Sequence, residues 1–326
     1  MWNMDGKTKF RWGMVGIGSG LHFLVDGLCL CCLYLISFPF DSPRMLGAFV
    51  TYNVLAFLSQ PLTGLWADRI RQKHWMLPAA VLSLALAVLV ASVWSSPATY
   101  FVSVLLGVGN SLFHVWGGKQ VVLKIGNDMR ALGLFVSTGA FGLSVAMVFF
   151  SWALLYVFLF SVCLLAAAYL CADFSVADVG TVVAEEVEPK DAPRFSHIVV
   201  CLLLLLIMAF VMFRSFLGES FTSPLVKDNV VVLLIGLTAM LGKMAGGWIA
   251  RRLGVVWALA LVLAVAFGCL LMHSSERGIL LTGLFAINCT MPVTLYLANL
   301  LLKGREGLAF GLLAAALIPG YLLSTL

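Results

Sequence analysis

Charged residues are scarce in this chain of 326 residues: they make up 11% of it, whereas hydrophobic residues make up 62%. A soluble domain has about 25% charged residues and about 45–50% apolar ones, so these charges are too few to cover a water-facing surface. The mean hydropathy of +1.05 indicates that most of the surface faces lipid. Because lipid cannot satisfy open backbone groups and no β-barrel alternation is present, we predict an all-α, polytopic membrane protein.

The sequence also lacks the motifs of several function classes. It has no Gly-x-x-x-x-Gly-Lys phosphate-binding loop, which argues against ATP-driven chemistry. The eight cysteines all lie in apolar runs, and no Cys/His set has metal-ligand spacing, so we expect no metal and no cofactor. The net charge of +5 is distributed over alternate loops and therefore reports topology, not nucleic-acid binding. No acid, base and nucleophile set converges, so we do not expect an enzyme.

Long apolar runs are abundant. A membrane-spanning helix needs roughly 20 apolar residues. Eleven runs qualify, at about 12–37, 44–66, 75–96, 98–122, 131–151, 153–172, 196–217, 229–250, 254–273, 278–301 and 306–326. With the N-terminus inside, the cytoplasmic segments hold fifteen Lys and Arg residues and the outer segments four. This bias predicts a multi-pass protein of the inner (plasma) membrane with a cytoplasmic N-terminus.

An acidic segment, 174–195, separates the sixth and seventh runs. We interpret it as a mobile cytoplasmic linker between an N-terminal six-helix bundle, 1–173, and a C-terminal bundle, 196–326. A regulatory docking segment is the alternative interpretation.

A short internal repeat supports two related halves. Gly64-Leu65-Trp66-Ala67-Asp68-Arg69 follows the second run, and Gly247-Trp248-Ile249-Ala250-Arg251-Arg252 follows the eighth, at an offset of 183. Both copies close an outward-to-inward span, as a parallel repeat of six spans requires. The offset predicts a second half that ends near residue 355, so we expect that five of its six helices are present. Truncation and a natural eleven-span protein both remain open.

The six-plus-six plan, the acidic central loop and the turn Gly64–Lys73 resemble the major facilitator superfamily. In that family a Gly-x-x-x-Asp-Arg turn is a signature, and this segment matches most of it; Arg71 stands where a glycine is usual. The resemblance implies a two-half bundle that moves a solute by alternating access.

Within that superfamily, residues 1–145 resemble the fosmidomycin-resistance type of exporter. The segments that carry this resemblance are Leu21–Asp26, Gln60-Pro61 and Gly107–His114. Val115 stands where that branch usually has proline, and Val25 where it tends to have asparagine. The resemblance implies export of a small solute across a bacterial inner membrane.

Ionisable groups inside spans are costly, by about 2.5–3.5 kcal/mol for an aspartate at a helix centre. Asp26 and His22 lie one turn apart in the first run, and Asn110 and His114 repeat this spacing in the fourth. The two histidines lie about 12–15 Å above the cytoplasmic boundary, in one depth band. We expect Asp26 and His114 to couple solute movement to protons, with His22 and Asn110 binding or tuning. Packing histidines that donate to carbonyls are the alternative.

Residues beside the repeat suit a cytoplasmic gate. Asp68 can pair with an arginine or cap a helix N-terminus across the interface between the halves. Gly64, Arg69, Arg251 and Arg252 complete the expected gate. For the two arginines of the second copy, positive-inside topology alone is the alternative.

Other polar residues within spans carry less information. Tyr52, Asn53 and Asn288 are candidates for the solute pathway, and Pro292 would free carbonyls near Asn288. We expect Arg214 and Lys243, nearer the span ends, only to snorkel.

We therefore expect a monomeric secondary transporter whose partners are a small molecule, protons and the bilayer, and which works by proton-coupled efflux. Uptake by symport and a non-transporting receptor or scaffold are the rivals. The scarcity of polar side chains favours a solute without multiple charges.

Overall fold

The computed structural model describes residues 6–37, 43–70, 75–94, 99–177, 196–225, 228–272 and 275–324, and the regular structure within these ranges is entirely helical. The helices are α1 (Gly6–Ser37), α2 (Pro43–Asn53), the π-helical segment η1 (Val54–Leu58), α3 (Gln60–Arg69), α4 (Met76–Val93), α5 (Thr99–Ile125), α6 (Met129–Phe149), α7 (Trp152–Ala177), α8 (His197–Thr222), α9 (Asn229–Leu253), α10 (Val255–Leu271), α11 (Arg277–Asn288), α12 (Met291–Leu301), α13 (Glu306–Ala315) and α14 (Leu317–Ser324).

Ten helical stretches of the described chain are long and apolar enough to cross a membrane. Three of them continue across an internal break: Met45–Arg69, Arg277–Leu301 and Glu306–Ser324. Helix α10 is equally apolar but has only 17 residues. These ten and α10 correspond to the eleven predicted runs, and the all-α polytopic fold is confirmed.

The internal breaks have a common local cause, which the hydropathy of the runs did not reveal. A proline lies within three residues after each break: Pro61 in α3, Pro292 in α12 and Pro319 in α14. Proline has no backbone N–H and its ring clashes with the carbonyl four residues earlier, so the preceding turn cannot continue as a regular α-helix. The tenth and eleventh spans are therefore each built from two shorter helices, and the second span from α2, η1 and α3.

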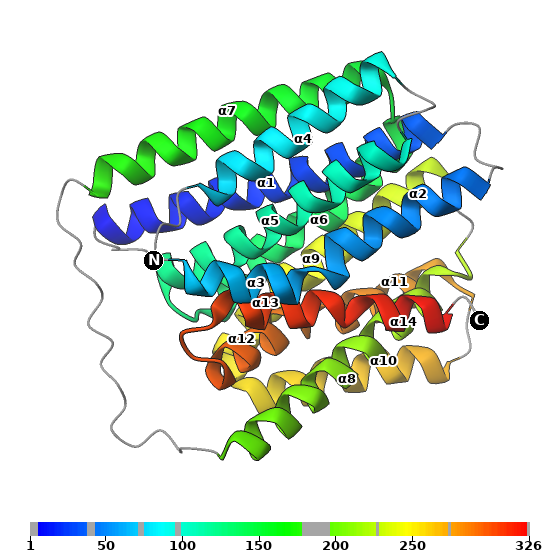
Figure 1. Cartoon of the computed structure of the whole chain (residues 1–326). Helices are drawn as coiled ribbons and strands as arrows, with labels where there is room; N and C mark the ends of the chain where they lie inside the picture. The colour runs from blue at the N-terminus through cyan, green and yellow to red at the C-terminus, as the bar shows by residue number, and fades with distance from the viewer. Residues whose placement is uncertain are drawn as a thin grey trace.

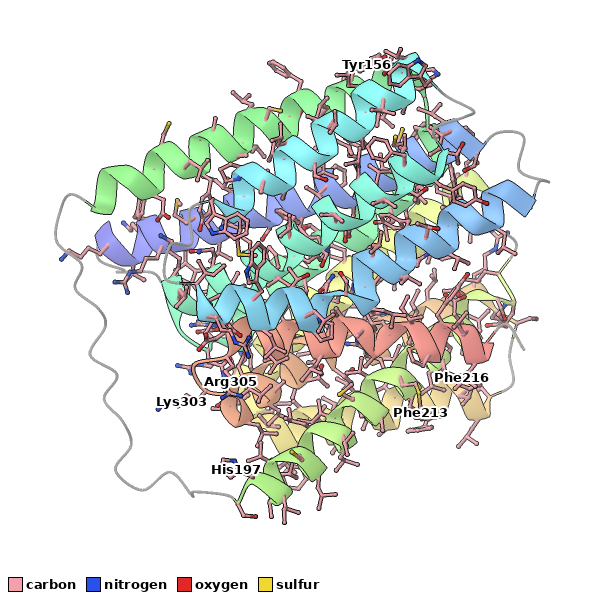
Figure 2. The ribbon with its side chains drawn as sticks, in the orientation of Figure 1. Tyr156, His197, Phe213, Phe216, Lys303 and Arg305 are labelled. Atoms are coloured by element: carbon pink, nitrogen blue, oxygen red, sulfur yellow. The ribbon has the colours of Figure 1, made fainter. Side chains whose placement is uncertain are left out.

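Successive spans run back and forth between two ends of the bundle, which lie at the left and the right of Figure 1. One end holds the start of α1 with Lys7 and Lys9, the end of α9 with Arg251, and the α12–α13 connection with Lys303 and Arg305. We call it the basic end. Figure 2 shows Lys303 and Arg305 there and Tyr156 at the opposite end.

The most extensive contacts between the first six spans and the later ones are those of α6 with α9 and of α3 with α13. Each pair approaches closely at a glycine of the repeat. A methyl group on Gly64 would overlap the carbonyl of Gly307, and one on Gly247 would overlap the carbonyl of Met129. Small residues allow such backbone approach in membrane bundles, so the two copies of the repeat have equivalent packing roles.

The predicted linker lies mostly outside the described residues. Residues 174–177 belong to α7, so this helix continues four residues beyond the predicted end of the N-terminal bundle at 173, although the part apolar enough to span a membrane is Trp152–Asp173. Residues 178–195 are not described, and the division into 1–173 and 196–326 stays a prediction.

Candidate functional site

Three ionisable side chains from two helices lie in contact inside the bundle. His22 and Asp26 lie one turn apart on α1, with His22 Nε2 3.2 Å from Asp26 Oδ2. His114, on α5, places its Nε2 3.4 Å from Asp26 Oδ1 and 2.9 Å from His22 Nε2. All three are buried, and we call them the triad. Asn110 donates its Nδ2 to Asp26 Oδ1 at 3.2 Å, so the four predicted polar residues form one cluster.

The hydrogen bonds of the triad fix the tautomers of both rings. His22 Nδ1 lies 2.7 Å from the Phe135 carbonyl oxygen, and His114 Nδ1 lies 3.0 Å from the Asn110 carbonyl oxygen. A carbonyl only accepts, so each Nδ1 carries a proton, and in a neutral imidazole the Nε2 is then a bare lone pair. Two bare lone pairs 2.9 Å apart repel each other. The geometry is satisfied when one proton lies between the two Nε2 atoms, where the Asp26 carboxylate balances its charge.

The same donors could hold a divalent cation. His22, Asp26 and His114 each offer one ligand atom, and these atoms lie within 4.8 Å of one another. Both Nδ1 atoms donate to carbonyls, which is the usual outer-shell arrangement of metal-binding histidines. The sequence showed no such spacing because the two histidines are 92 positions apart. Gly139 leaves room beside the cluster: a methyl group there would overlap the Asp26 carboxylate.

Phe310 covers the triad toward the basic end. It comes from α13, is 6% exposed, and its ring centre lies 6.4 Å from that of His114 and 6.2 Å from that of Phe135. Gly118 provides the space for it, because a methyl group at that position would overlap the Phe310 ring. A residue of the later spans therefore closes a site that is built by the first spans.

Asp68 joins the same two parts of the chain at the basic end. Its carboxylate accepts hydrogen bonds from the backbone N–H of Gly307 at 3.1 Å and of Leu308 at 2.9 Å, in the first turn of α13. It also pairs with Lys119 of α5 at 2.7 Å. The N-cap residue of α13, Arg305, makes no side-chain cap, so the carboxylate satisfies amides that would otherwise lack a partner. The cation beside Asp68 is a lysine, not the arginine that sequence analysis offered.

The arginines of the second copy do not form such a contact. Arg251 occupies the position equivalent to Asp68, and both it and Arg252 are exposed and form no ion pair within the described chain. The helix they would serve, α6, is capped by its own Asp128, which accepts from the backbone N–H of Arg130 at 2.8 Å. The described geometry therefore favours the topological interpretation of both arginines. Arg69 is exposed as well.

The remaining predicted pathway residues divide into two groups. Tyr52 is buried and interacts with the Cys29 thiol. Asn110 Nδ2 contacts that thiol at 3.8 Å, so Tyr52 adjoins the cluster. Asn53 donates to the Phe49 carbonyl and Asn288 to the Leu284 carbonyl, each within its own helix. Neither hydrogen bond reaches the triad.

Several polar contacts of the structure are not predicted from the sequence. Lys119 lies near the end of the fourth predicted run, 98–122, and is buried and bonded to Asp68. Arg214 was expected to snorkel, yet it is 6% exposed and its Nη1 has no hydrogen-bond partner. Lys243 acts electrostatically on both Asp26 and Arg214. A cation in an apolar run was the available signal for all three.

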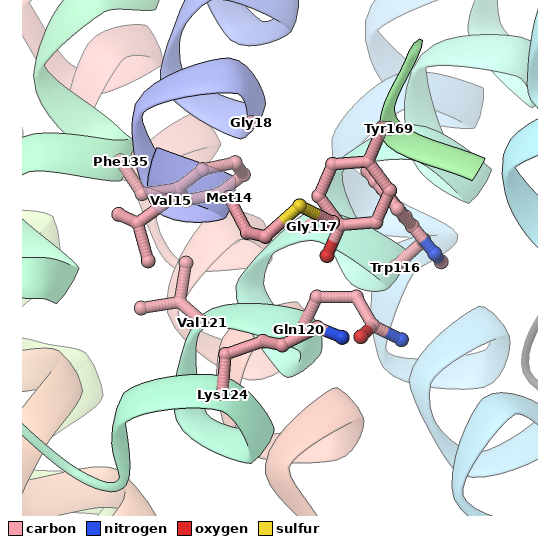
Figure 3. A pocket seen from close by; sticks show the side chains of 10 residues that line it. All are labelled: Met14, Val15, Gly18, Trp116, Gly117, Gln120, Val121, Lys124, Phe135 and Tyr169. Carbon is pink, nitrogen blue, oxygen red and sulfur yellow. The ribbon is translucent and has the colours of Figure 1, made fainter. Parts of the chain in front are cut away.

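A small cavity lies near the triad, toward the basic end, and Figure 3 shows the side chains that line it. Gly18 and Gly117 line it, about one turn from His22 and His114 respectively, and so does Phe135, whose carbonyl holds the His22 ring. Its polar lining comes from Gln120, Lys124 and Tyr169. The cavity lies among α1, α5, α6 and α7, on the N-terminal side of the interface with the later spans.

Comparisons with known proteins agree with this architecture. The family model described as Major Facilitator Superfamily matches residues 16–324. Among curated proteins, no sequence matches the chain.

Three solved structures share the fold at low sequence identity. The transporter FucP in its outward conformation has a TM-score of 0.63 and 14% identity, over 98% of this chain and 91% of its own. The human organic anion transporter MFSD10 has a TM-score of 0.65 and 18% identity, over 98% and 93%. A bacterial homologue of the iron transporter ferroportin, in an outward-facing state, has a TM-score of 0.61 and 14% identity, over 96% and 90%.

Proposed function

Because the chain belongs to the Major Facilitator Superfamily of secondary transporters, we propose that it moves a small organic solute by alternating access and couples that movement to protons at the triad. The protein is a multi-pass membrane transporter and not an enzyme. The observation that carries the proton coupling is the 2.9 Å approach of the two Nε2 atoms, each with its Nδ1 bonded to a carbonyl.

The triad links its protonation to helix packing. With one shared proton, the pair of imidazoles and the Asp26 carboxylate are together neutral, and α1 and α5 can stay in contact. Without the proton, two lone pairs and a carboxylate face one another in a buried site, where the repulsion is strong. Loss of the proton therefore favours a conformation in which the two rings separate and water reaches them.

Access to the triad from the basic end requires that α13 move. Phe310 must withdraw from the pocket at Gly118, and the hydrogen bonds from Gly307 and Leu308 to Asp68 must break. We propose that this end faces the cytoplasm of a monomeric inner-membrane protein, because the basic residues gather there. In the described conformation, the cytoplasmic gate is then closed.

We propose export as the direction, on the resemblance of residues 1–145 to the fosmidomycin-resistance type of exporter. Uptake by symport is the second candidate, and the cations of buried Arg214 and partly buried Lys243 favour it, since an anion bound near them and a proton at the triad would attract each other. Solute affinity at two pH values separates the two directions. Acidification weakens the binding of a solute that competes with the proton and strengthens the binding of one that travels with it.

The test begins with a thermal-shift screen of the purified protein against metabolites and antibiotics at two pH values. The compound that stabilises most is then followed into proteoliposomes under an imposed pH gradient. We expect gradient-driven accumulation by the wild type, and we expect Asp26→Asn to abolish it while exchange of labelled for unlabelled solute continues.

Asn53→Ala is the matched control, since among the described residues the Asn53 amide donates to Phe49 of its own helix and does not reach the triad, and it should behave as wild type. Unchanged gradient-driven accumulation in Asp26→Asn would disprove the coupling role. Binding without any transport in the wild type would favour the receptor alternative.

A further inference from the structure

Arg214 is a buried cation without a countercharge. It lies on α8, is 6% exposed, and its Nη1 has no hydrogen-bond partner. Within the described ranges no carboxylate forms an ion pair with it. An isolated charge in a low-dielectric interior costs several kcal/mol. Packing alone would have placed leucine or methionine here, so the guanidinium requires a function.

Lys243 brings a second cation to the same region. It lies on α9, the helix that packs along α6, and it interacts electrostatically with Arg214, with Asp26 and with His114. No hydrogen bond or ion pair of its ammonium group is present in the described chain. Lys243 is therefore close enough to act both on the triad, which belongs to α1 and α5, and on Arg214 of α8.

The charges of this region do not balance. With its shared proton the triad is neutral, and Arg214 and Lys243 then leave two positive charges uncompensated. One monovalent anion would remove half of this excess, and a guanidinium presents N–H donors in the geometry that a carboxylate or phosphate oxygen pair accepts.

We propose that Arg214 and Lys243 form the binding site for an anionic group, a carboxylate or a phosphate-type oxyanion, of the transported solute. This inference rests on the proposed function, because it places the solute next to the triad, and an anionic solute there supports the symport candidate. It also agrees with the few polar side chains of the bundle, which favour a solute with little further charge.

Three probes of similar size and different charge test the substrate class: benzoate, benzamide and benzylamine, with inorganic phosphate as a second anion. Their effect on the melting temperature of the full chain is measured in an uncharged detergent at neutral pH. We expect stabilisation by an anion and not by benzamide or benzylamine. Arg214→Gln and Lys243→Gln should each lower the affinity for the stabilising anion at least tenfold.

A second readout needs no ligand. If the two cations are kept for an anion, then the empty protein is more stable without them, so Arg214→Met and Lys243→Met should raise its melting temperature. Lys119→Met is the matched control, because Lys119 is a buried cation that does have a partner, Asp68. Its removal should lower the melting temperature, since it leaves a buried carboxylate without its cation.

Lower melting temperatures in Arg214→Met and Lys243→Met would make both cations structural and would overturn the inference. So would equal shifts with all three aromatic probes, no shift with any anion, or a shift that appears only when phosphatidylglycerol is added, which would assign the site to a lipid headgroup. The assay uses no pH gradient, so these outcomes leave proton coupling standing, and a failed Asp26→Asn test leaves the anion site standing.

Discussion

The contact between Asp68 and the first turn of α13 gives a quantitative prediction for the gate. Two backbone amides donate to one carboxylate, at 3.1 and 2.9 Å. Hydrogen bonds to a charged group contribute about 1.5–3 kcal/mol each, and neutral ones about 0.5–1.5. Asp68→Asn keeps one acceptor oxygen and loses the charge, so the closed basic end should lose about 3 kcal/mol. Each 1.4 kcal/mol is about tenfold, so the open population should rise about a hundredfold.

Ala309 offers a reporter of that opening. It lies on α13 directly after the capped turn and has no exposed surface, so a cysteine at this position reacts with a maleimide only when α13 leaves α3. We expect Asp68→Asn to accelerate labelling of Ala309→Cys about a hundredfold, as follows from the loss of about 3 kcal/mol. Mass spectrometry of the peptides separates this reaction from labelling of the native cysteines.

Two controls accompany the measurement. Arg251→Gln changes the position of the second repeat copy that corresponds to Asp68, where the side chain is exposed, and it should leave the labelling rate unchanged. Native Cys289, which is 1% exposed, reports general loosening of the bundle and should label equally slowly in all variants. A labelling rate in Asp68→Asn close to that of the parent would show that these hydrogen bonds do not hold the gate, and the reasoning from their geometry would be refuted.

Two further substitutions test the triad and the cap of α6. Gly139→Ala places a methyl group against the Asp26 carboxylate and His22 Nε2, so pH-gradient-driven transport should fail, whereas Gly16→Ala, in open space, should not affect it. Partial burial acts against ionisation of Asp128, but hydrogen bonds from the Arg130 side chain and backbone outweigh it and hold the pKa of Asp128 below its usual 3.8. A lowered pKa stabilises the fold above the unfolded-state value and loses that contribution as pH falls through the folded value. Asp128→Asn should therefore lower the melting temperature at neutral pH, by an amount that vanishes on acidification; a deficit that persists in acid would contradict this.

Sequence alone predicted the class of the protein and the depth of its polar residues. Hydropathy located the spans because each must be both apolar and long. Rise per residue then placed Asp26 and His114 at one depth on two helices, and the structure brings their side chains within 3.4 Å. Depth follows from the sequence because a membrane fixes the direction of every helix axis.

Rotation about each helix axis does not follow from the sequence in the same way. Whether Arg214 faces lipid or the interior depends on which side of α8 packs on α14 and α11, and hydropathy does not contain that choice. The same limit hid Phe310, whose place over His114 depends on how α13 sits against Gly118. It also hid the Phe135 carbonyl, which holds the His22 ring from α6, 113 residues away. These contacts join distant parts of the chain, and they form only once the helices are packed in one particular rotation.

The two copies of the repeat show why one interface is suited to opening. On the α6–α9 side, α6 is capped by its own Asp128, and Arg130 lies over the rings of both Trp12 and Trp248, at 5.5 and 5.3 Å. The polar groups at the start of α6 are thus satisfied locally, and cation–π contacts add to the packing of α6 on α1 and α9.

On the α3–α13 side the capping residue comes from the first six spans, because Asp68 caps α13, whose own N-cap residue makes no side-chain hydrogen bond. When α13 moves, water can replace Asp68 as the partner of the first amides of α13. When α9 moves, the cap of α6 by Asp128 stays unchanged. We therefore infer that the basic end opens between α3 and α13 while α6 and α9 stay packed. An acidic residue is needed at position 68 because it caps α13. None is needed at position 251, because α6 is capped by its own Asp128.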